Sequence, residues 1–182
     1  MTTWFASDHH FDHKNIIKYC NRPYSSVDEM NEALIDNHNS VVKKNDEVFL
    51  IGDFGFCKHS DAKKLLHHRY RLNGDITFIR GNHDTEKDLL RSFHRVESYH
   101  EIKIDDTKII MCHYPLFVWN KHHHGAWHIH GHCHGSLIKL QKDYYKRKVI
   151  DAGVDPLNYF PISYEQLRDV MNKREIITVD HH

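Results

Sequence analysis

The sequence lacks two features that would place it in a specialised class of protein. It carries no excess charge, since 25 Lys and Arg residues balance 25 Asp and Glu residues and the formal net charge is +0. That balance argues against a general binder of polyanions or of membrane surfaces. The four cysteines are scattered and form no CxxC pair. We therefore expect no disulfide framework, and we predict reduced thiols in a cytoplasmic protein.

Long apolar segments are also missing. The opening stretch MTTWFASDHH has no basic region followed by an apolar core. No apolar run approaches the roughly 20 residues that a membrane span needs. We expect neither a recognisable export signal nor a membrane-embedded protein. With 182 residues and no linker, internal repeat or low-complexity segment, the chain predicts a single domain over residues 1–182.

Histidine, in contrast, is abundant, with 20 in the chain. An ordinary composition would give about a quarter of that number. Histidine is the commonest metal ligand and the usual acid–base residue near neutral pH. His181 and His182 could be the remnant of a purification tag, and we assign them no role. The other histidines lie within the body of the chain, so a tag does not explain them.

Short apolar runs alternate with helical patterns, which favours an α/β fold. Expected strands are residues 2–7, 47–51, 76–80, 96–104, 108–112, 126–130, 137–140, 148–151 and 175–179. Expected helices are residues 14–20, 26–42, 60–70, 85–92 and 164–173. The second half is richer in strands, which predicts a second sheet packed on the first. The basic stretch 139–148 is expected to include a solvated hairpin tip.

Five of the apolar runs end in residues that bind metals. These strand ends carry Asp8-His9-His10, Gly52-Asp53, Gly81-Asn82-His83-Asp84, His113 and Gly131-His132-Cys133-His134. In open α/β sheets the ligand site lies outside the carboxyl ends of the strands. Five such ends would bring Asp, Asn and His side chains into one small volume.

The residue types predict a site for two metal ions. Nitrogen and carboxylate ligands suit manganese, iron and zinc. An aspartate has two oxygens and can bridge two cations about 3.5–4 Å apart. Gly52 and Gly81 would let the backbone turn sharply beside the ions. If the D-x-H and H-x-H segments are extended, alternate residues point the same way, so His9 and Cys133 would point away from the metals.

The order D-x-H, G-D, G-N-H-D, H, G-H-x-H between residues 8 and 134 resembles the calcineurin-like metallophosphoesterase superfamily. Two further segments, SDHHFDHKNII and DAGVDPLNYFPIS, resemble a subgroup of short bacterial and phage predicted phosphoesterases. The resemblance implies a four-layer αββα sandwich, in which two mixed sheets lie face to face with helices outside. It also implies two divalent metal ions, with Mn²⁺ favoured and Fe, Zn, Ni or Mg as alternatives.

The resemblance further implies a role for each motif residue. The first metal would be held by Asp8, His10, Asp53 and His134. The second would be held by Asp53, Asn82, His113 and His132, with Asp53 as the bridge. His83 would donate a proton to the leaving oxygen or stabilise its charge, and Asp84 would orient and charge that imidazole.

The predicted activity is hydrolysis of a phosphate ester by a metal-activated water. A small nucleotide-like phosphodiester is favoured, because a short chain leaves little material for a cap domain or an extended nucleic-acid groove. A phosphomonoesterase, a nuclease and a non-catalytic metal-binding interaction scaffold stay open. Three further residues are candidate substrate contacts: Arg22, through bidentate binding of phosphate, and His123 and His124, whose segment leads into the last ligand strand.

Overall fold

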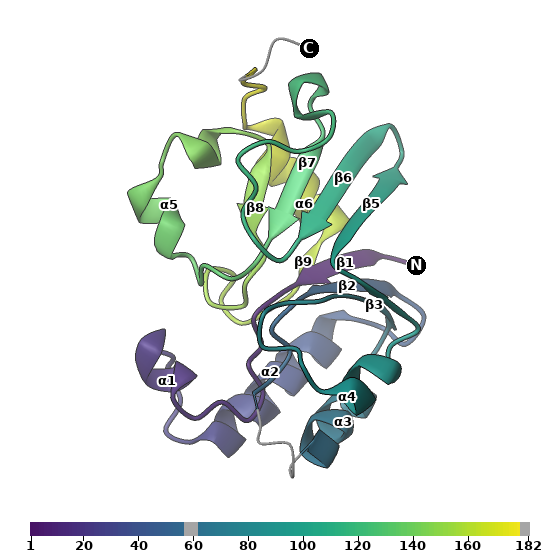
Figure 1. Ribbon diagram of the computed structural model, residues 1–182, viewed down its shortest axis with the longest axis vertical. Coiled ribbons are helices and arrows are strands. Elements are labelled where there is room, and N and C mark those ends of the chain that lie inside the picture. The colour runs from purple at the N-terminus through teal and green to yellow at the C-terminus, as the bar shows by residue number, and fades with distance from the viewer. Residues whose placement is uncertain (57–61, 179–182) are drawn as a thin grey trace.

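The first sheet combines the N-terminal half of the chain with one late strand (Figure 1). The computed structural model describes residues 1–56 and 62–178. In the order β4-β3-β2-β1-β9, the first four strands run parallel, and β9 runs antiparallel to β1. The bounds are Thr3–Ala6 for β1, Glu47–Ile51 for β2, Asp75–Ile79 for β3, Arg95–Glu97 for β4 and Ile162–Ser163 for β9.

The second sheet confirms the prediction made from the strand-rich second half. Its order is β5-β6-β7-β8, with β5 antiparallel to β6 and the other pairs parallel. The bounds are Tyr99–Ile104 for β5, Thr107–Cys112 for β6, Trp127–His130 for β7 and Val149–Asp151 for β8. Both sheets are therefore mixed, as predicted.

Strand β2 shows how the sequence builds two cores at once. All but the first of its residues are buried, as expected for a strand covered on both faces. Val48 and Leu50 join the core beneath the helices. Phe49 and Ile51 point the other way and join the core between the two sheets. This alternation follows from the period of two residues along a strand.

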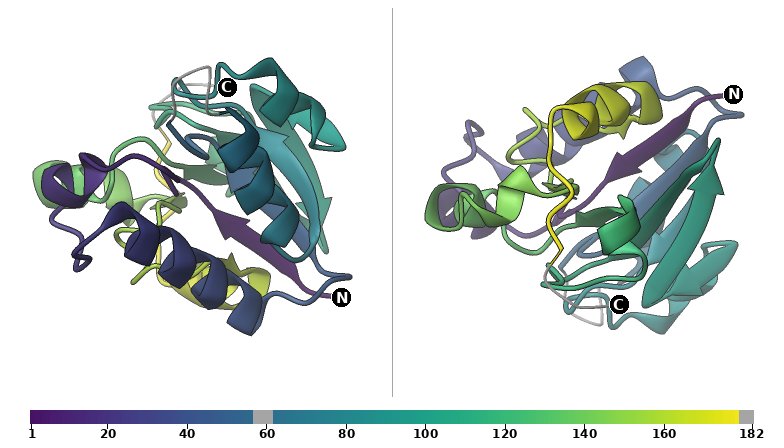
Figure 2. Two further views of the ribbon diagram at one scale, coloured as in Figure 1. Left: turned by 90° about the horizontal axis from the view of Figure 1, so that it is seen from below. Right: turned by 90° about the horizontal axis from the view of Figure 1, so that it is seen from above.

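Three helices cover the outer face of the first sheet (Figure 2). They are α2, Val27–Val41, α3, Ala62–Arg71, and α4, Lys87–Arg91. Helix α2 begins as predicted, because the side chain of Ser26 accepts a hydrogen bond from the backbone N–H of Glu29. Helix α6, Tyr164–Asn172, begins in a capping box formed by Ser163 and Gln166. Leu167 and Met171 of α6 pack into the core between the sheets.

The outer face of the second sheet has a thinner cover. Ile110 and Val149 pack there against Trp119, Ala126 and Tyr145. These partners belong to the connection between β6 and β7 and to the short helix η3, Tyr144–Lys146. The fourth layer is thus made of short segments in place of long helices.

Three predicted strands differ from the structure. Residues 96–104 divide between β4 and β5, because the chain passes from the edge of one sheet to the edge of the other. Residues 137–140 lie in helix α5, Ser136–Leu140, where Gly135 at φ 76° turns the chain away from the sheet. The basic stretch therefore holds part of α5 and η3, and it forms no hairpin. Of residues 175–179, Glu175 makes one bridge to Arg147, and Val179 lies outside the described residues.

Disulfides and membrane spans can be examined only in the part of the chain that the structure describes. There, Cys20, Cys112 and Cys133 are free thiols. None of the described helices has the length and apolar character needed to cross a membrane.

Leu34 tests the core beneath the helices. It is 1% exposed on α2, so Leu34→Ala leaves a cavity and should lower the free energy of unfolding by about 2–5 kcal/mol. Urea unfolding followed by circular dichroism measures the change. Asp36→Ala, on the exposed face of the same helix, is the control and should stay within about 0.5 kcal/mol of wild type. Equal stability of both variants would contradict this packing.

Candidate metal centre

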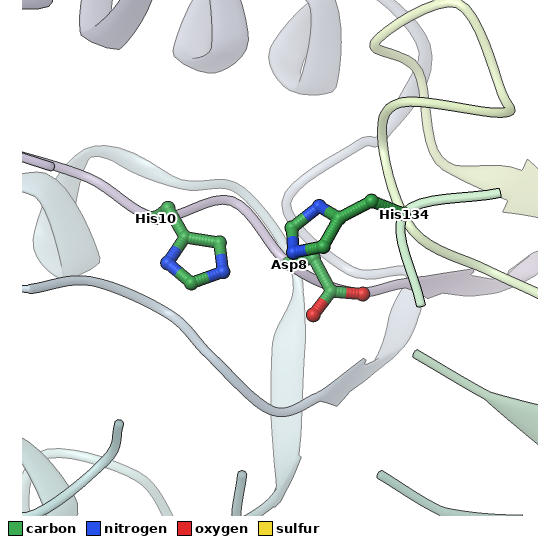
Figure 3. Close-up of side chains that lie close together, drawn as sticks. All are labelled: Asp8, His10 and His134. Carbon is green, nitrogen blue, oxygen red and sulfur yellow. The ribbon is translucent and has the colours of Figure 1, made fainter. Parts of the chain in front are cut away.

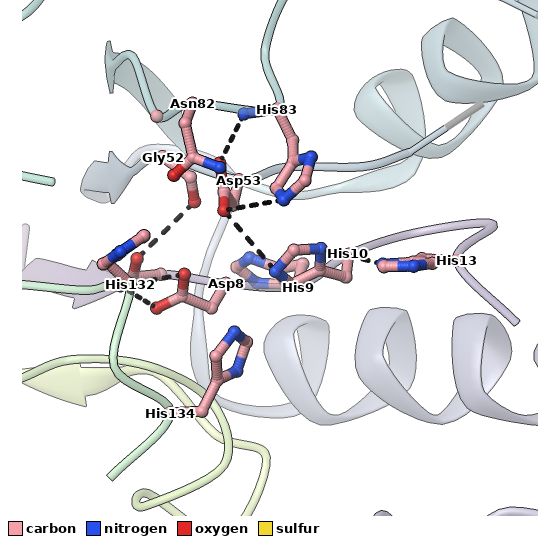
Figure 4. A network of polar contacts seen from close by, with 12 residues as sticks. Asp8, His9, His10, His13, Gly52, Asp53, Asn82, His83, His132 and His134 are labelled. Atoms are coloured by element: carbon pink, nitrogen blue, oxygen red, sulfur yellow. Dashed lines mark hydrogen bonds and ion pairs between the residues drawn. The ribbon is translucent and has the colours of Figure 1, made fainter. Parts of the chain in front are cut away.

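Five loops meet where the carboxyl ends of β1, β2, β3, β6 and β7 adjoin. Figure 4 shows labelled residues from the loops after β1, β2, β3 and β7. Backbone hydrogen bonds hold neighbouring loops together beyond the strands. The N–H groups of Asp8 and His10 donate to the carbonyls of Gly52 and Asp53, each over 3.0 Å. Within the second sheet, the N–H of Gly131 donates to the carbonyl of His113 over 3.0 Å, and between the sheets the N–H of His132 donates to the carboxylate of Asp8 over 2.9 Å. The predicted convergence of strand ends is therefore present.

The ligand loops turn through left-handed backbone conformations. Positive φ angles occur at Asp8 (58°), His10 (54°), Asp53 (51°), His132 (69°) and His134 (48°). Such conformations are strained for residues other than glycine, and they cluster at functional sites. The D-x-H and H-x-H segments are therefore not extended, and the condition under which His9 and Cys133 would point away from the metals is not met.

The expected outward direction holds for His9 and fails for Cys133. His9 is buried and stacks on Phe11 with ring centroids 5.4 Å apart. Burial lowers the pKa of His9 to about 3, so this imidazole is neutral. Cys133 instead forms part of the wall of the cavity beside the ligands. Burial raises the pKa of its thiol to about 12, which argues against a reactive thiolate.

Asp53 lies at the centre of the site. Its Oδ2 atom is 3.4 Å from Nε2 of His113, 3.6 Å from Nε2 of His10 and 4.0 Å from Nε2 of His83. Its Oδ1 atom accepts a hydrogen bond from the backbone N–H of His83 over 2.9 Å. Burial by itself would raise the pKa of Asp53, but His113 and the His83 amide outweigh it and hold the pKa at about 2. A charged carboxylate between imidazoles has the position expected of a bridging ligand.

A first group of candidate ligand atoms comes from Asp8, His10 and His134 (Figure 3). These atoms lie within 4.8 Å of one another. The carboxylate of Asp8 accepts the backbone N–H of His132 at 3.0 and 2.9 Å. Burial raises the pKa of Asp8 to about 7, and a neighbouring cation would favour the charged form.

His10 gives a direct test of whether the first group fits a metal. Its Nε2 atom is buried and has no hydrogen-bond partner among the described residues. Burial lowers the pKa of His10 to about 2, so the imidazole is neutral, as a metal ligand must be. A buried nitrogen that makes no hydrogen bond, beside Asp8 and His134, fits a cation that it would coordinate.

Candidate ligand atoms of Asp53, His113 and His132 form a second group, within 4.8 Å of one another. Nδ1 of His113 lies 2.9 Å from the carbonyl of Ile51, so it carries the proton and donates there. This contact leaves Nε2 free to bind a metal, the usual arrangement for a histidine ligand. Oδ1 of Asn82 lies 3.2 Å from that Nε2 atom. The other six predicted ligands are thus gathered around Asp53.

Arg22 does not have the predicted position at the substrate. It is buried, and its Nε and Nη2 atoms each donate to the carboxylate of Asp155 over 2.8 Å. Its Nη1 and Nη2 atoms also donate to the carbonyls of His9 (2.8 Å) and Asp8 (2.7 Å). Arg22 therefore ties the first ligand loop to the loop of Asp155.

Asp155 in turn positions His134, a role that the sequence reasoning missed. Its Oδ2 atom lies 2.7 Å from Nδ1 of His134, which leaves Nε2 of that ring for a metal. Burial alone would lower the pKa of His134, but the hydrogen bond to Asp155 raises it to about 10. In the sequence, the segment DAGVDPLNYFPIS carries the family resemblance but gives Asp155 no role. No local pattern indicates that Asp155 meets Arg22, which lies 133 positions earlier.

Asp84 also differs from its predicted role beside the His83 imidazole. Its Oδ2 atom accepts the N–H groups of Asp53 and Gly81, both over 2.7 Å, and its Oδ1 atom accepts that of Phe54 over 3.0 Å. Asp84 is 1% exposed, and burial raises its pKa. The carboxylate therefore fixes the backbone of two ligand loops to each other, and it supports the site through Asp53.

His123 and His124 lie away from the centre, which corrects the prediction that they contact the substrate. They belong to the short helix η2, His122–His124, just before β7. His124 lines a separate cavity with Lys121, Lys148 and Asn172. The physical reason is the direction of strand β7. His123 and His124 precede β7 and so lie at its amino end, whereas the candidate ligands follow it at its carboxyl end.

An open cavity of about 650 Å³ adjoins the ligand groups. His10, Asp53, Asn82, His83, His132 and His134 contribute to its wall. The side chain of His83 is 35% exposed, so it reaches this space. The fold and the site together define an α/β protein of two mixed sheets, with a candidate centre for metal ions at the joined strand ends.

Comparison with known proteins gives the family. No family model matches the chain. The uncharacterized protein MJ1445 of Methanocaldococcus jannaschii is 38% identical over 179 residues, which are 96% of this chain and 93% of that protein. The chain belongs to the family of this archaeal protein.

Solved structures support the fold. The protein of unknown function AQ665 from Aquifex aeolicus has 24% identity and a TM-score of 0.76, with 93% of this chain and 98% of that chain covered. YfcE, a phosphoesterase from E. coli, is a distant match with 16% identity, a TM-score of 0.45 and coverage of 74% and 70%. That likeness is too weak to say anything of function. The predicted fold of two mixed sheets with helices is confirmed.

Asp155→Asn tests the positioning of His134. The amide pairs less strongly with Arg22 and with the imidazole, so we expect about 10–100-fold weaker binding of a metal ion. Isothermal titration with Mn²⁺ measures the affinity and the number of sites. Asp143→Asn, which changes an exposed carboxylate paired with Lys146, is the matched control. Wild-type affinity at every site in Asp155→Asn would contradict the assigned role.

Proposed function

We propose that this protein is a phosphoesterase that uses two divalent metal ions to hydrolyse a phosphate ester. One observation carries the proposal: two groups of ligand atoms adjoin at Asp53, and the same open cavity reaches both. Two cations held a few ångströms apart by a bridging carboxylate are typical of phosphatases and nucleases.

The proposed ligand sets follow the two groups. Asp8, His10, Asp53 and His134 hold one ion, and Asp53, Asn82, His113 and His132 hold the other. This donor set of nitrogen and oxygen accepts Mn²⁺, which we favour, and also Fe, Zn, Ni or Mg. When bound, such ions supply a water of lowered pKa and neutralise the charge on the phosphoryl oxygens.

His83 is the proposed general acid. Its backbone N–H is fixed by Oδ1 of Asp53, and its Nε2 atom lies 4.0 Å from Oδ2 of the same residue. The ring is thus held beside the ligands and remains open to the cavity. From this place Nε2 would donate a proton to the oxygen that leaves phosphorus.

We favour a small phosphodiester as substrate, although the ligand sets alone suit a monoester or a nucleic acid equally well. We disfavour the non-catalytic scaffold, because the side chains of both proposed ligand sets lie close together and His83 borders the same cavity. A mixed screen of chromogenic diesters, monoesters and single-stranded oligonucleotides separates these alternatives. If protein loaded with Mn²⁺ hydrolyses none of these compounds, the proposed function is wrong.

His83→Ala should keep both metal ions and lower turnover by about 10²–10⁴-fold, the usual contribution of a general acid. Turnover of bis(p-nitrophenyl) phosphate and metal content by mass spectrometry measure the two effects separately. His124→Ala, at the opposite end of the second sheet, is the control and should match wild type. Full activity of His83→Ala would refute the assigned role.

Removal of the metal ions should lower both activity and stability. A ligand that binds only the folded state stabilises it by about 2.7 kcal/mol at a concentration 100 times its Kd. We therefore expect Mn²⁺ to raise the unfolding temperature in calorimetry and a chelator to reverse the shift. In Asp53→Asn, which keeps the shape and loses the bridging charge, the shift should be largely lost. If Mn²⁺ does not change the unfolding temperature of the wild-type protein, that result counts against a metal centre.

A further inference from the structure

The cavity at the metal centre continues past His134 into a second cavity. The two have volumes of about 650 and 640 Å³, and they share Cys20, His134 and Ser136 in their walls. Helix α1, Ile16–Tyr19, and helix α5 lie on the same side of the molecule in both views of Figure 2. Together the cavities form one groove between these helices, with the metal centre along its length.

The first arm of the groove, on the His83 side, is walled by a row of rings. The ring of Phe56 lies 5.4 Å from that of His83 and 4.7 Å from that of His13. Tyr19 follows at 6.2 Å from His13. Phe56 and Tyr19 are 47% and 74% exposed, so their rings are open to a ligand. Such a wall suits a planar aromatic group, which gains from stacking as well as from apolar burial.

The second arm, beyond His134, is largely apolar. Ile138, Leu140, Pro156 and Tyr159 line it, together with Lys139. Ile138 and Leu140 are exposed although they are large and apolar. The carboxylate of Asp155 also borders this arm, but its charge is paired with Arg22 and His134. This arm therefore suits an apolar or aromatic group.

The ring of His10 lies between the two arms. Its centroid is 5.4 Å from that of His83 and 5.1 Å from that of His134. A phosphate at the metal centre would therefore have open space on both sides. A monoester carries one substituent and fills one arm, while a diester carries two and fills both.

We propose that the substrate is a phosphodiester with an apolar or aromatic substituent on each side, whose leaving group lies in the first arm and whose retained group lies in the second. This inference rests on the proposed function and names its substrate class. It makes Tyr19 and Phe56 determinants for the leaving group, and Ile138 and Leu140 determinants for the retained group.

Two diesters with the same leaving group test the arms separately. Bis(p-nitrophenyl) phosphate has an aromatic retained group, and methyl p-nitrophenyl phosphate has only a methyl group there. The double variant Ile138→Ser/Leu140→Ser should lower kcat/KM for the first diester about three- to tenfold, through lost apolar contact, and leave the second unchanged. Tyr19→Ala should lower kcat/KM for both diesters by about two- to tenfold, because both place p-nitrophenolate in the first arm.

Matched controls separate these effects from general damage. Tyr70→Ala removes a tyrosine that is 72% exposed at the far end of α3, and it should match wild type on both diesters. Ile176→Ser removes an exposed apolar side chain from the cavity at the opposite end of the second sheet. If the double variant melts at a lower temperature than wild type, Leu140→Ser alone repeats the test, since Leu140 is 74% exposed.

A binding experiment gives a readout that does not depend on turnover. Diphenyl phosphate, titrated into protein loaded with Mg²⁺ and followed by NMR, should shift the amide signals of Tyr19 and Leu140 and leave that of Ile176 in place. If the amide signal of Tyr19 shifts and that of Leu140 does not, the proposal that the second arm binds the retained group is wrong.

The outcomes distinguish this inference from the proposed function. If wild type hydrolyses none of these esters, the proposed function fails. If both diesters are hydrolysed but the double variant affects them equally or not at all, the phosphoesterase stands and the two-armed groove is refuted. A higher kcat/KM for p-nitrophenyl phosphate than for bis(p-nitrophenyl) phosphate would also refute it.

Discussion

The close approach of the two sheets at Gly52 is the constraint on which the site depends. A Cβ atom at this position would lie 2.5 Å from Nδ1 of His113 and 2.7 Å from the backbone of Gly81. Any side chain would therefore push the second sheet away from the first. Gly52 also has a φ of 83°, which turns the chain so that Asp53 faces His113. Without this contact, the candidate ligands of the two sheets would lie apart and could not form one site.

Buried charge around the centre is balanced by partners from distant parts of the chain. Asp84 is held by three backbone amides, and Asp155 is held by Arg22 and His134. Such contacts matter because a buried carboxylate without partners would shift its pKa and become neutral. They also compensate for the left-handed backbone of the ligand loops, since each loop is fixed by hydrogen bonds to a neighbour. The result is a hydrogen-bonded frame in which Nε2 of His10 accepts or donates no hydrogen bond among the described residues and lies 3.6 Å from the carboxylate of Asp53.

Much of the fold, and the gathering of metal-type side chains at the strand ends, could be predicted, because the signals are local. Strand β2 is a continuous apolar run, so its burial could be predicted. Asp53 closely follows this run, so the position of Asp53 at a strand end could be predicted as well. The roles of Arg22 and Asp155 could not, because nothing in either segment indicates that they are neighbours in space. The assignments of His123 and His124 failed for a related reason: nearness to a ligand strand in sequence placed them at the wrong end of that strand.

The sequence by itself determined the two-sheet α/β fold and the identity of the metal-type side chains at the strand ends. These follow from apolar periodicity and from the chemistry of Asp, Asn and His, which each segment carries on its own. Only the tertiary structure decided which atoms meet, because that depends on backbone turns and on contacts between residues far apart along the chain. It turned Asp84 toward the backbone and Arg22 toward Asp155. It also opened the groove on both sides of His10, since α1 and α5 come together only in the folded chain.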